Sequence, residues 1–208
     1  MLGGGGHASV LVELLLSQGR EILAIVSPDD ISERHIFDGV RHLKNDNDVL
    51  QFNPELVLLV NGIGPMPGSL LRNQLSDNFS KLGYQFESVI SPNAIVSPSA
   101  ILSAGVQIFH AAVIQVGVSI GENTIINTGA IIEHDCQIGK DNHIAPRATL
   151  CGQVLTEKNV YVGAAATIIQ NIKIEQGSVV GAGTTITHDL AYEHIAYACR
   201  PILRKKVK

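Results

Sequence analysis

The sequence predicts a chain of two parts, a small α/β domain followed by a parallel β-helix that takes up most of the remaining length. From residue 90 to residue 186 an aliphatic residue returns at every sixth position with a single exception, which is the repeat of a β-helix. Before residue 87, short apolar stretches alternate with amphipathic helical stretches, as in α/β domains. We therefore expect an α/β domain at 1–86, a β-helix at 87–190 and a C-terminal tail at 191–208.

The first part contains signals for helices and strands in alternation. The stretch "GGGGHASVLVELLLSQGR" is a Gly-rich turn entering a helix in which Leu11, Leu14 and Leu15 share one face, with Gly19 as its stop. The stretches "EILAIVS" and "ELVLLVNG" are apolar enough for short buried parallel strands. A second helix, "GSLLRNQLSDNFSKLGY", ends at Gly83. This alternation indicates a Rossmann-like unit, although only Met1 and Leu2 precede the Gly-rich loop, where such a unit has a buried strand.

The second part is built from repeats of six residues. A period of six is neither the helix period nor simple alternation, and it fits short strands that each end at a corner. Three strands then close a rung of eighteen residues, and the aliphatic residues stack inside. Thr156 interrupts this column, so with Glu157 it is expected to distort one corner. The column consists of Ile90, Val96, Leu102, Ile108, Ile114, Ile120, Ile126, Ile132, Ile138, Ile144, Leu150, Thr156, Val162, Ile168, Ile174, Val180 and Ile186.

The composition limits the possible partners. Hydrophobic residues make up 45% of the chain and charged residues 16%, which indicates a globular protein. A net charge of −4 does not suggest a nucleic-acid partner, and no apolar run is long enough to span a membrane. Three scattered cysteines form neither a disulfide framework nor a metal motif, so we expect no metal. The start lacks the basic region of a signal peptide, and a cytoplasmic location is the simplest expectation.

The stretch "AIIEHDCQIG" places a histidine between two acids. An imidazole has the basicity to remove a proton near neutral pH, and a carboxylate on its other ring nitrogen would orient it. Glu133 and Asp135 are both adjacent to His134, and neighbouring residues in a strand point to opposite faces. One rung of eighteen residues after His134 comes Gly152, whose N–H would then be open to an oxyanion.

Four stretches carry a resemblance to a known family: "IINTGAIIEHDCQIG", "GGGGHA", "VNGIG" and "LGYQFESVISPNAIVSPSA". Together they resemble the left-handed β-helix acyltransferases with hexapeptide repeats. The resemblance is to the branch of PglD-like nucleotide-sugar N-acetyltransferases and NeuD-like sialic acid O-acetyltransferases. It implies a left-handed coil, a homotrimer with active sites between subunits, acetyl-CoA as co-substrate, and a nucleotide-linked 4-amino sugar as acceptor.

The resemblance also assigns roles to residues. It implies that His134 is the general base, that Asp135 rather than Glu133 orients it, and that the Gly152 N–H is the oxyanion donor, with Asn127 as a polar residue of the same site. The residues implied for acetyl-CoA are His143, Ala164 and Ala182. Those implied for the sugar nucleotide are Gly5, Gly6, His7, Asn61 and Gly62. The basic C-terminus, with Arg200, Arg204 and Lys205, could pair with CoA phosphates or be solvated.

The predicted function is therefore acetyl-CoA-dependent N-acetylation of a nucleotide-linked amino sugar, of the 4-amino-4,6-dideoxyhexose type. O-acetylation of a sialic acid would use the same residues and stays open. A β-helix carbonic anhydrase would need closely spaced histidines, yet His134 and His143 should face different ways. A non-catalytic β-helix binding protein would not need the histidine–acid motif. The nucleotide base, the sugar stereochemistry and the choice between N and O transfer are not encoded in any of these motifs.

Overall fold

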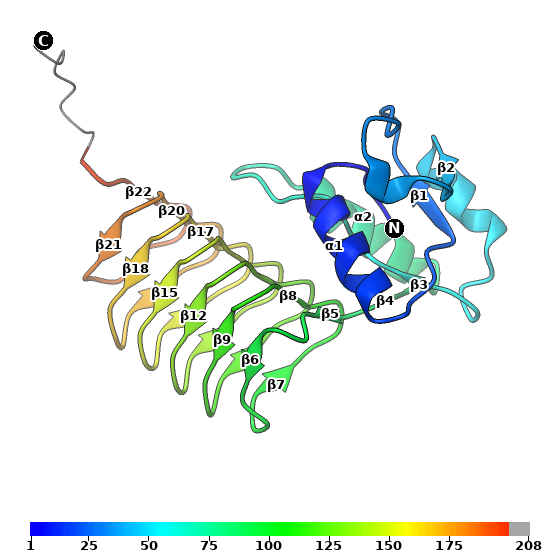
Figure 1. The fold of residues 1–208 in the computed structure, drawn as a ribbon. Helices are drawn as coiled ribbons and strands as arrows, with labels where there is room; N and C mark the ends of the chain where they lie inside the picture. Colours follow the sequence, from blue (N-terminus) through cyan, green and yellow to red (C-terminus); the bar gives the residue numbers. More distant parts are fainter. Residues whose placement is uncertain (200–208) are drawn as a thin grey trace, which may run out of the picture.

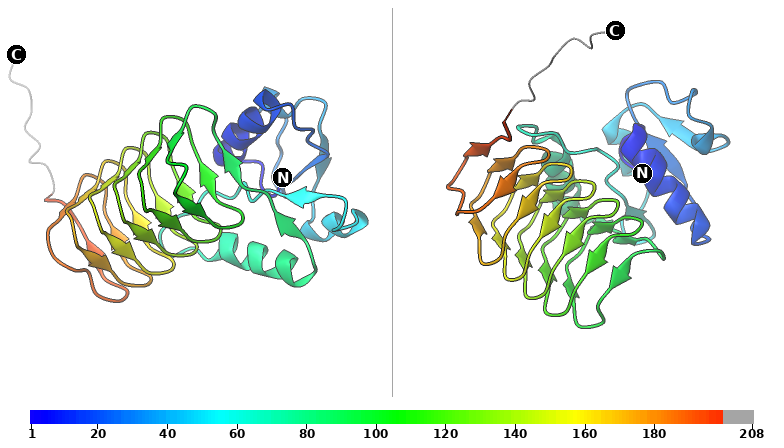
Figure 2. Two further views of the ribbon diagram at one scale, coloured as in Figure 1. Left: turned by 90° about the horizontal axis from the view of Figure 1, so that it is seen from below. Right: turned by 60° about the vertical axis from the view of Figure 1, so that its left-hand side comes forward.

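The computed structural model describes residues 1–199 and consists of an α/β domain beside a triangular coil of parallel strands (Figure 1). The α/β domain lies beside the first rungs of the coil, its loop 65–70 reaches along the later strands β14, β17 and β20, and the described chain ends at the far end of the coil (Figure 2). The basic residues Arg200, Arg204 and Lys205 lie outside the described residues. Within residues 1–199 no helix has the length and apolar character needed to cross a membrane.

The coil has three parallel sheets, one for each side of the triangle. Its strands are β5 (Val89–Ile90), β6 (Ile95–Val96), β7 (Ile101–Leu102), β8 (Gln107–Ile108), β9 (Val113–Ile114), β10 (Ser119–Ile120), β11 (Ile125–Ile126), β12 (Ile131–Ile132), β13 (Gln137–Ile138), β14 (His143–Ile144), β15 (Thr149–Leu150), β16 (Leu155–Thr156), β17 (Tyr161–Val162), β18 (Thr167–Ile168), β19 (Lys173–Ile174), β20 (Val179–Val180), β21 (Thr185–Ile186) and β22 (Ile195–Ala196). The sheets run β5-β8-β11-β14-β17-β20-β22, β6-β9-β12-β15-β18-β21 and β7-β10-β13-β16-β19. This architecture confirms the β-helix prediction.

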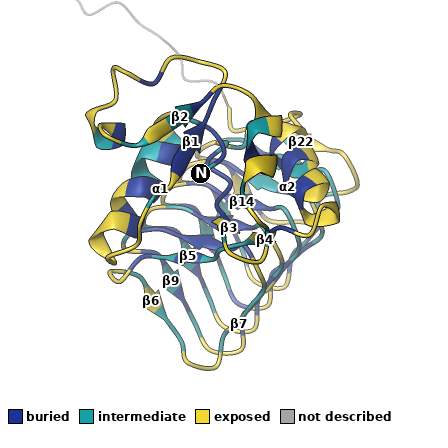
Figure 3. Ribbon diagram, turned by 90° about the vertical axis from the view of Figure 1, so that its right-hand side faces the viewer, coloured by how far each residue is buried: buried dark blue, intermediate teal, exposed yellow. Residues whose placement is uncertain are grey.

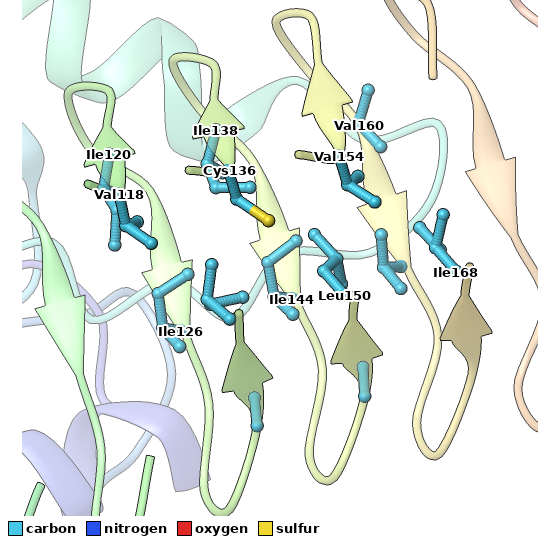
Figure 4. Packing of buried hydrophobic residues seen from close by; sticks show 14 of the residues in the cluster. Val118, Ile120, Ile126, Cys136, Ile138, Ile144, Leu150, Val154, Val160 and Ile168 are labelled. Carbon is cyan, nitrogen blue, oxygen red and sulfur yellow. The ribbon is translucent and has the colours of Figure 1, made fainter. Parts of the chain in front are cut away.

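The rung of eighteen residues is visible in the register. Ile126 pairs with Ile144, and Ile144 pairs with Val162, so each column residue lies directly on the next one. These side chains and the small residues at the corners point into the coil, where they form its core (Figure 4). From β8 to β21 the inward-facing second residue of each strand is buried, and most exposed residues of the coil lie in its turns (Figure 3). Each rung therefore buries its apolar face only because another rung lies on it.

The expected distortion at Thr156 is wrong. Thr156 is buried, and β16 pairs in register with both neighbouring strands. Its hydroxyl accepts hydrogen bonds from the Asn142 side chain at 2.6 Å and from the Gly139 backbone at 3.2 Å. Asn142 in turn accepts a bond from the Val160 backbone at 2.6 Å. The threonine fits the aliphatic column because a buried polar group with hydrogen-bond partners does not carry the cost of an unsatisfied one.

The coil also continues beyond the predicted end at residue 190. β22 pairs with β20 in the longest sheet, with Val179 opposite Ile195. This partner lies sixteen residues along the chain, two fewer than in the regular rungs, so the period of six no longer marks it. The Glu175 carboxylate accepts a hydrogen bond from the Tyr192 backbone at 3.0 Å and so supports this shorter return. The predicted tail therefore contributes a strand.

The α/β domain is built around short parallel strands. Its elements are α1 (Gly6–Ser17), β1 (Ala24–Val26), η1 (His35–Phe37), β2 (Arg41–Leu43), η2 (Asp46–Gln51), β3 (Leu58–Leu59), α2 (Leu71–Lys81) and β4 (Gln85–Phe86). β1 pairs with β2 and β3 pairs with β4, and the N-terminal Leu2 makes parallel bridges to Val26 and to Asn61. The spatial order is thus β2, β1, Leu2, β3, β4. Leu11, Leu14 and Leu15 of α1 are buried as predicted.

The two parts share a polar interface along α2 and the coil. Buried Arg72 donates to the Asn61 and Ile63 carbonyl oxygens of its own domain at 2.7 and 2.9 Å, and to the Asn123 carbonyl oxygen of the coil at 3.4 Å. Lys140 of the coil lies 3.4 Å from Asp77 of α2. Asn73 of α2 also donates to Asn159 of the coil. These contacts fix the α/β domain against one edge of the coil. The last strand of this domain ends at 86, and the coil begins with β5 at 89.

Candidate active site

The turn between β12 and β13, residues 133–136, is called here the His134 corner. His134 Nδ1 lies 2.8 Å from Asp135 Oδ2, and both side chains are about half exposed. Asp135 has a left-handed backbone with φ of 61°, which bends the chain so that two adjacent side chains meet. Of the two candidate acids, Asp135 is therefore the one bonded to His134. With Nδ1 bonded to a carboxylate, the Nε2 lone pair is available to take a proton.

Gly152 lies one rung beyond His134, directly against its ring. A Cβ atom on Gly152 would fall 2.6 Å from both Cε1 and Nε2 of His134, closer than real side-chain contacts. The Gly152 N–H has no hydrogen-bond acceptor among the described residues. Gly152 itself is buried beneath the imidazole. The glycine thus both makes room for the base and holds an unused donor next to it.

Sequence reasoning missed Gly117, which lies one rung before Asp135. A Cβ atom on Gly117 would collide with Asp135 Oδ1. The same step of eighteen residues that connected His134 with Gly152 also connects Asp135 with Gly117, so the signal was present in the sequence. The pair His134 and Asp135 therefore lies between two glycines, one on each neighbouring rung.

A second group, called here the His143 cluster, consists of His143, Asn127 and Tyr161 on the longest sheet. The Asn127 amide lies 3.2 Å from His143 Nε2, and the Tyr161 ring stands edge-on at 4.9 Å. Buried His143 Nδ1 has no partner among the described residues. Desolvation, followed by the charges of His7 and Arg72, lowers the pKa of His143 to about 3. This histidine is therefore neutral at physiological pH.

The His143 cluster borders a groove of about 420 Å³. One wall is the loop 65–70 of the α/β domain, and the other is the outer face of β14, β17 and β20. No hydrogen bond in residues 1–199 connects this cluster to the His134 corner, which lies on a different edge of the coil. The single chain thus carries two separate groups of the predicted site residues.

Ala164 and Ala182 lie at the corner that follows the longest sheet. Both are exposed and stack one rung apart, and the Gly183 N–H donates to the Ala164 carbonyl at 2.9 Å. Their small side chains leave the backbone of this corner accessible over successive rungs. Such a surface can receive an extended ligand, but the structure places these alanines neither at the His134 corner nor in the His143 groove.

The Gly-rich loop divides into two packed and two open glycines. A Cβ atom on Gly3 would come within 2.8 Å of Ile63, and one on Gly4 would collide with Ile31. Gly5 and Gly6 have open space where a side chain would be, and they begin helix α1. The first turn of α1 has no acidic residue and no side-chain cap, so its free N–H groups favour an anion.

His7 follows this loop and contacts the coil. Its Nε2 lies 2.8 Å from Gln107 Oε1, and its ring packs on Phe109 at 5.2 Å. Gln107 donates its amide to the Asn61 carbonyl at 2.8 Å, so its oxygen must accept from His7 Nε2–H. Desolvation, then the Arg72 charge, lowers the pKa of His7 to about 4, against the opposing Gln107 bond. His7 is thus neutral, with Nδ1 as an acceptor.

The prediction that Asn61 and Gly62 contact the sugar nucleotide disagrees with their packing. The buried Asn61 side chain donates to the Arg72 carbonyl and to Ser76 and accepts from the Ile63 N–H. The Gly62 N–H donates to the Leu2 carbonyl at 2.6 Å, and a Cβ there would meet Ala8 at 2.8 Å. The Asn61 side chain and the Gly62 N–H are used inside the domain, where they help to hold the sheet and α2 together.

Within residues 1–199, no three His, Cys, Asp or Glu side chains converge as they would around a metal ion. His134 and His143 lie on different sides of the coil, one in a turn and one in a strand. Cys136 is buried in the core, where burial raises the pKa of its thiol to about 11, and it remains a packing residue.

Comparison with known proteins places the chain in a family. Residues 117–152 match the model of the bacterial transferase hexapeptide (six repeats). PerB from Caulobacter crescentus, in a structure with CoA and GDP-perosamine, is 31% identical over 95% of this chain and 92% of its own, with a TM-score of 0.83. The acetyltransferase domain of PglB from Neisseria gonorrhoeae, solved with acetyl coenzyme A, is 26% identical over 95% and 94%, with a TM-score of 0.85. WeeI from Acinetobacter baumannii shares the fold at 22% identity over 95% and 94%, with a TM-score of 0.81.

This identity and coverage show that the chain belongs to the left-handed β-helix sugar acyltransferases built from hexapeptide repeats. It is thus an acyltransferase, and the handedness of its coil is that of the family.

Proposed function

We propose that this chain transfers the acetyl group of acetyl-CoA to the amino group of a nucleotide-linked sugar of the 4-amino-4,6-dideoxyhexose type. The observation that carries the proposal is the hydrogen-bonded pair of His134 and Asp135, packed against Gly152 with its unused N–H. The similarity to PerB, whose structure contains CoA and GDP-perosamine, supports the choice of substrates. These substrates favour a cytoplasmic location for the reaction.

In the proposed reaction, His134 acts as the general base. Its Nε2 removes a proton from the amine as the nitrogen attacks the thioester carbon, and the Asp135 carboxylate stabilises the imidazolium that forms. The Gly152 N–H donates to the oxygen that becomes negative in the tetrahedral intermediate. When the carbon–sulfur bond breaks, His134 can return its proton to the CoA thiolate. The products are the N-acetylated sugar nucleotide and CoA.

The α/β domain is assigned to the sugar nucleotide. We interpret it as Rossmann-like because its strand order, with Leu2 as the central strand, follows the doubly wound pattern. The diphosphate is assigned to Gly5 and Gly6 at the start of α1, where the helix dipole and open N–H groups favour an anion. His7, neutral and with Nδ1 free to accept, is placed next to a hydroxyl or amine of the sugar.

The complete site is proposed to form between copies of the chain in a homotrimer. The supporting observation is that the His134 corner and the His143 cluster lie on different edges of one coil, so a second copy is needed to bring such groups together. Acetyl-CoA is assigned to the groove between neighbouring coils. Ala164 and Ala182 contact its pantetheine arm there, and His143 and Asn127 lie near the thioester end.

The test is a thiol-release assay with acetyl-CoA and a panel of GDP-, UDP- and dTDP-linked 4-amino-4,6-dideoxy sugars, together with free sialic acid. Turnover of one amino sugar is expected and would also identify the nucleotide. Turnover of sialic acid alone would replace N-acetylation by O-acetylation. If CoA binds and no panel member reacts, the proposed acceptor class is wrong.

A further inference from the structure

Gly117 lies directly under the carboxylate of Asp135. A Cβ atom on Gly117 would collide with Asp135 Oδ1, and it would also lie 3.4 Å from Cγ and 3.5 Å from Cα of that aspartate. The free space above Gly117 is thus the space that the Asp135 side chain uses. Oδ1 lies over the glycine while Oδ2 holds His134 Nδ1 at 2.8 Å.

The backbone alone does not explain why this position is glycine. Gly117 has a φ of 74°, in the left-handed region that favours glycine. The same place in other turns of the coil is taken by Ala111 and Ala165, with φ of 56° and 54°. The coil therefore accepts alanine in this conformation. Unlike those two positions, Gly117 has an aspartate one rung above it. Asn123 lies under Asp141 in the same way and carries a side chain, so the feature specific to Gly117 is that the Asp135 carboxylate occupies the place of a Cβ atom.

Asp135 cannot move away from an added methyl group without losing its partner. Its backbone N–H donates to the Val116 carbonyl at 3.0 Å, which ties it to the rung that contains Gly117. The Gln153 N–H donates to the His134 carbonyl at 2.9 Å and ties the corner to the rung beyond. With the backbone held on both sides, a methyl group at 117 is most readily accommodated by rotation of the carboxylate, which is the flexible end of the side chain.

We propose that Gly117 is a positioning residue of the acetyl transfer, because it leaves the space in which the Asp135 carboxylate holds His134. The proposal rests on the proposed function of His134 as the base. Gly117 itself touches neither substrate. It acts through Asp135, so its loss should affect the chemical step and leave substrate binding unchanged.

The experiment compares Gly117→Ala with two matched glycine variants. Gly129→Ala introduces the same left-handed alanine, at φ of 67°, where the Cβ meets only Arg147 at an ordinary 3.5 Å. Gly105→Ala places a Cβ atom 2.6 Å from the Asn123 carboxamide. This is a similar steric clash with a side chain one rung further on, but it lies outside the His134 corner. We expect Gly117→Ala to lower kcat by about 10- to 100-fold with KM unchanged. Both control variants should keep the wild-type kcat.

A double-mutant cycle with Asp135→Asn separates positioning from a general structural effect. If Gly117 acts only through the carboxylate, Gly117→Ala should cause little further loss of kcat in the Asp135→Asn background. The NMR signal of the Nδ1-bound proton of His134, which reports the bond to Asp135, should disappear in Gly117→Ala and persist in both controls. This signal tests the positioning role independently of turnover.

Three results would overturn the proposal. One is a Gly117→Ala enzyme with the kcat and the Nδ1 proton signal of Gly129→Ala. Another is full additivity in the cycle. The third is a Gly117→Ala chain that does not fold while both controls do, which would assign the glycine to stability. A His134→Ala enzyme that keeps its turnover would instead reject the proposed base, whatever the Nδ1 signal shows for Gly117.

Discussion

Two histidines nine residues apart in the same coil have opposite surroundings. His134 lies in an exposed turn and is bonded to the Asp135 carboxylate. His143 lies in a strand, is buried, and has the Asn127 amide as its only polar partner in the described chain. Burial beside an amide favours the neutral ring of His143. The first histidine therefore has an exposed ring that a carboxylate orients, and the second is a buried, uncharged contact.

The difference arises from where the corners and the α/β domain fall. A corner turns outward, so His134 keeps access to solvent. The face that carries His143 is covered by the α/β domain, which brings His7 and Arg72 close enough to lower its pKa further. The exposure and the polar partners of a histidine in this coil thus depend on whether it lies at an open corner or on the face that the α/β domain covers.

The largest expected effect comes from removing the proposed base. His134→Ala should lower kcat by about 10²- to 10⁴-fold with the fold intact, because a general base contributes on that scale. His188→Ala is the matched control, since this exposed histidine occupies the same edge of the coil three rungs further on. Steady-state kinetics with circular dichroism would measure both. Near wild-type turnover in His134→Ala would show that His134 is not the base, so the two histidines would no longer differ in function.

The buried histidines should make the protein sensitive to acid. An ordinary histidine has a pKa of 6.5, whereas the folded-state pKa of His143 is about 3 and that of His7 about 4. Below pH 6.5 the unfolded chain therefore binds protons that the folded chain does not, and the free energy of unfolding falls as the pH falls. The slope should approach about 1.4 kcal/mol per pH unit for each such histidine.

Urea unfolding at steps between pH 7 and pH 5 would measure this slope. His143→Gln should remove the share of His143 and leave that of His7. His35→Gln, at an exposed histidine, is the matched control and should change the slope less than His143→Gln does. A stability that is flat over this range would contradict the neutral state of both buried histidines.

A smaller effect is expected from a substitution that makes the surroundings of His143 resemble those of His134. Asn127→Asp gives His143 a carboxylate partner in place of an amide, so the pKa of His143 should rise from its value of about 3 by roughly one unit or more. An NMR titration of the His143 ring would follow this shift. The control cannot be Asn142→Asp, because the Asn142 amide is already hydrogen-bonded in the core. Thr128→Asp, one residue further into the exposed turn, should shift it less. Equal shifts would indicate a general charge effect.

Much of the coil could be predicted because each residue has the same kind of neighbour, another residue eighteen positions away. That rule predicted the core column and connected Gly152 with His134. It would equally have connected Gly117 with Asp135, had it been applied in the other direction. Thr156 was misjudged because the rule carries no information on hydrogen bonds between corners, where Asn142 supplies the missing partner.

The α/β domain was less predictable because its contacts follow no period. The strand β2 has the sequence Arg-His-Leu, too short and too polar to signal a strand, and it forms because β1 pairs with it. Asn61, in the stretch "VNGIG", was predicted to contact a ligand, yet its side-chain amide donates to the Arg72 carbonyl and to Ser76 of α2. The burial of His143 was equally hidden, since it depends on how this domain lies on the coil.

The fixed rung length also decides how this chain could be lengthened. Inserting eighteen residues at a corner beyond Gly152 would add one full rung and return every later residue to its own edge, although Tyr161 would no longer lie on the rung next to His143. Inserting six would move all that follows to the next edge and carry Ala164 and Ala182 away from the corner they occupy. In such a coil, duplications of whole rungs keep every later residue on its own edge, so length should vary among descendants in units of eighteen.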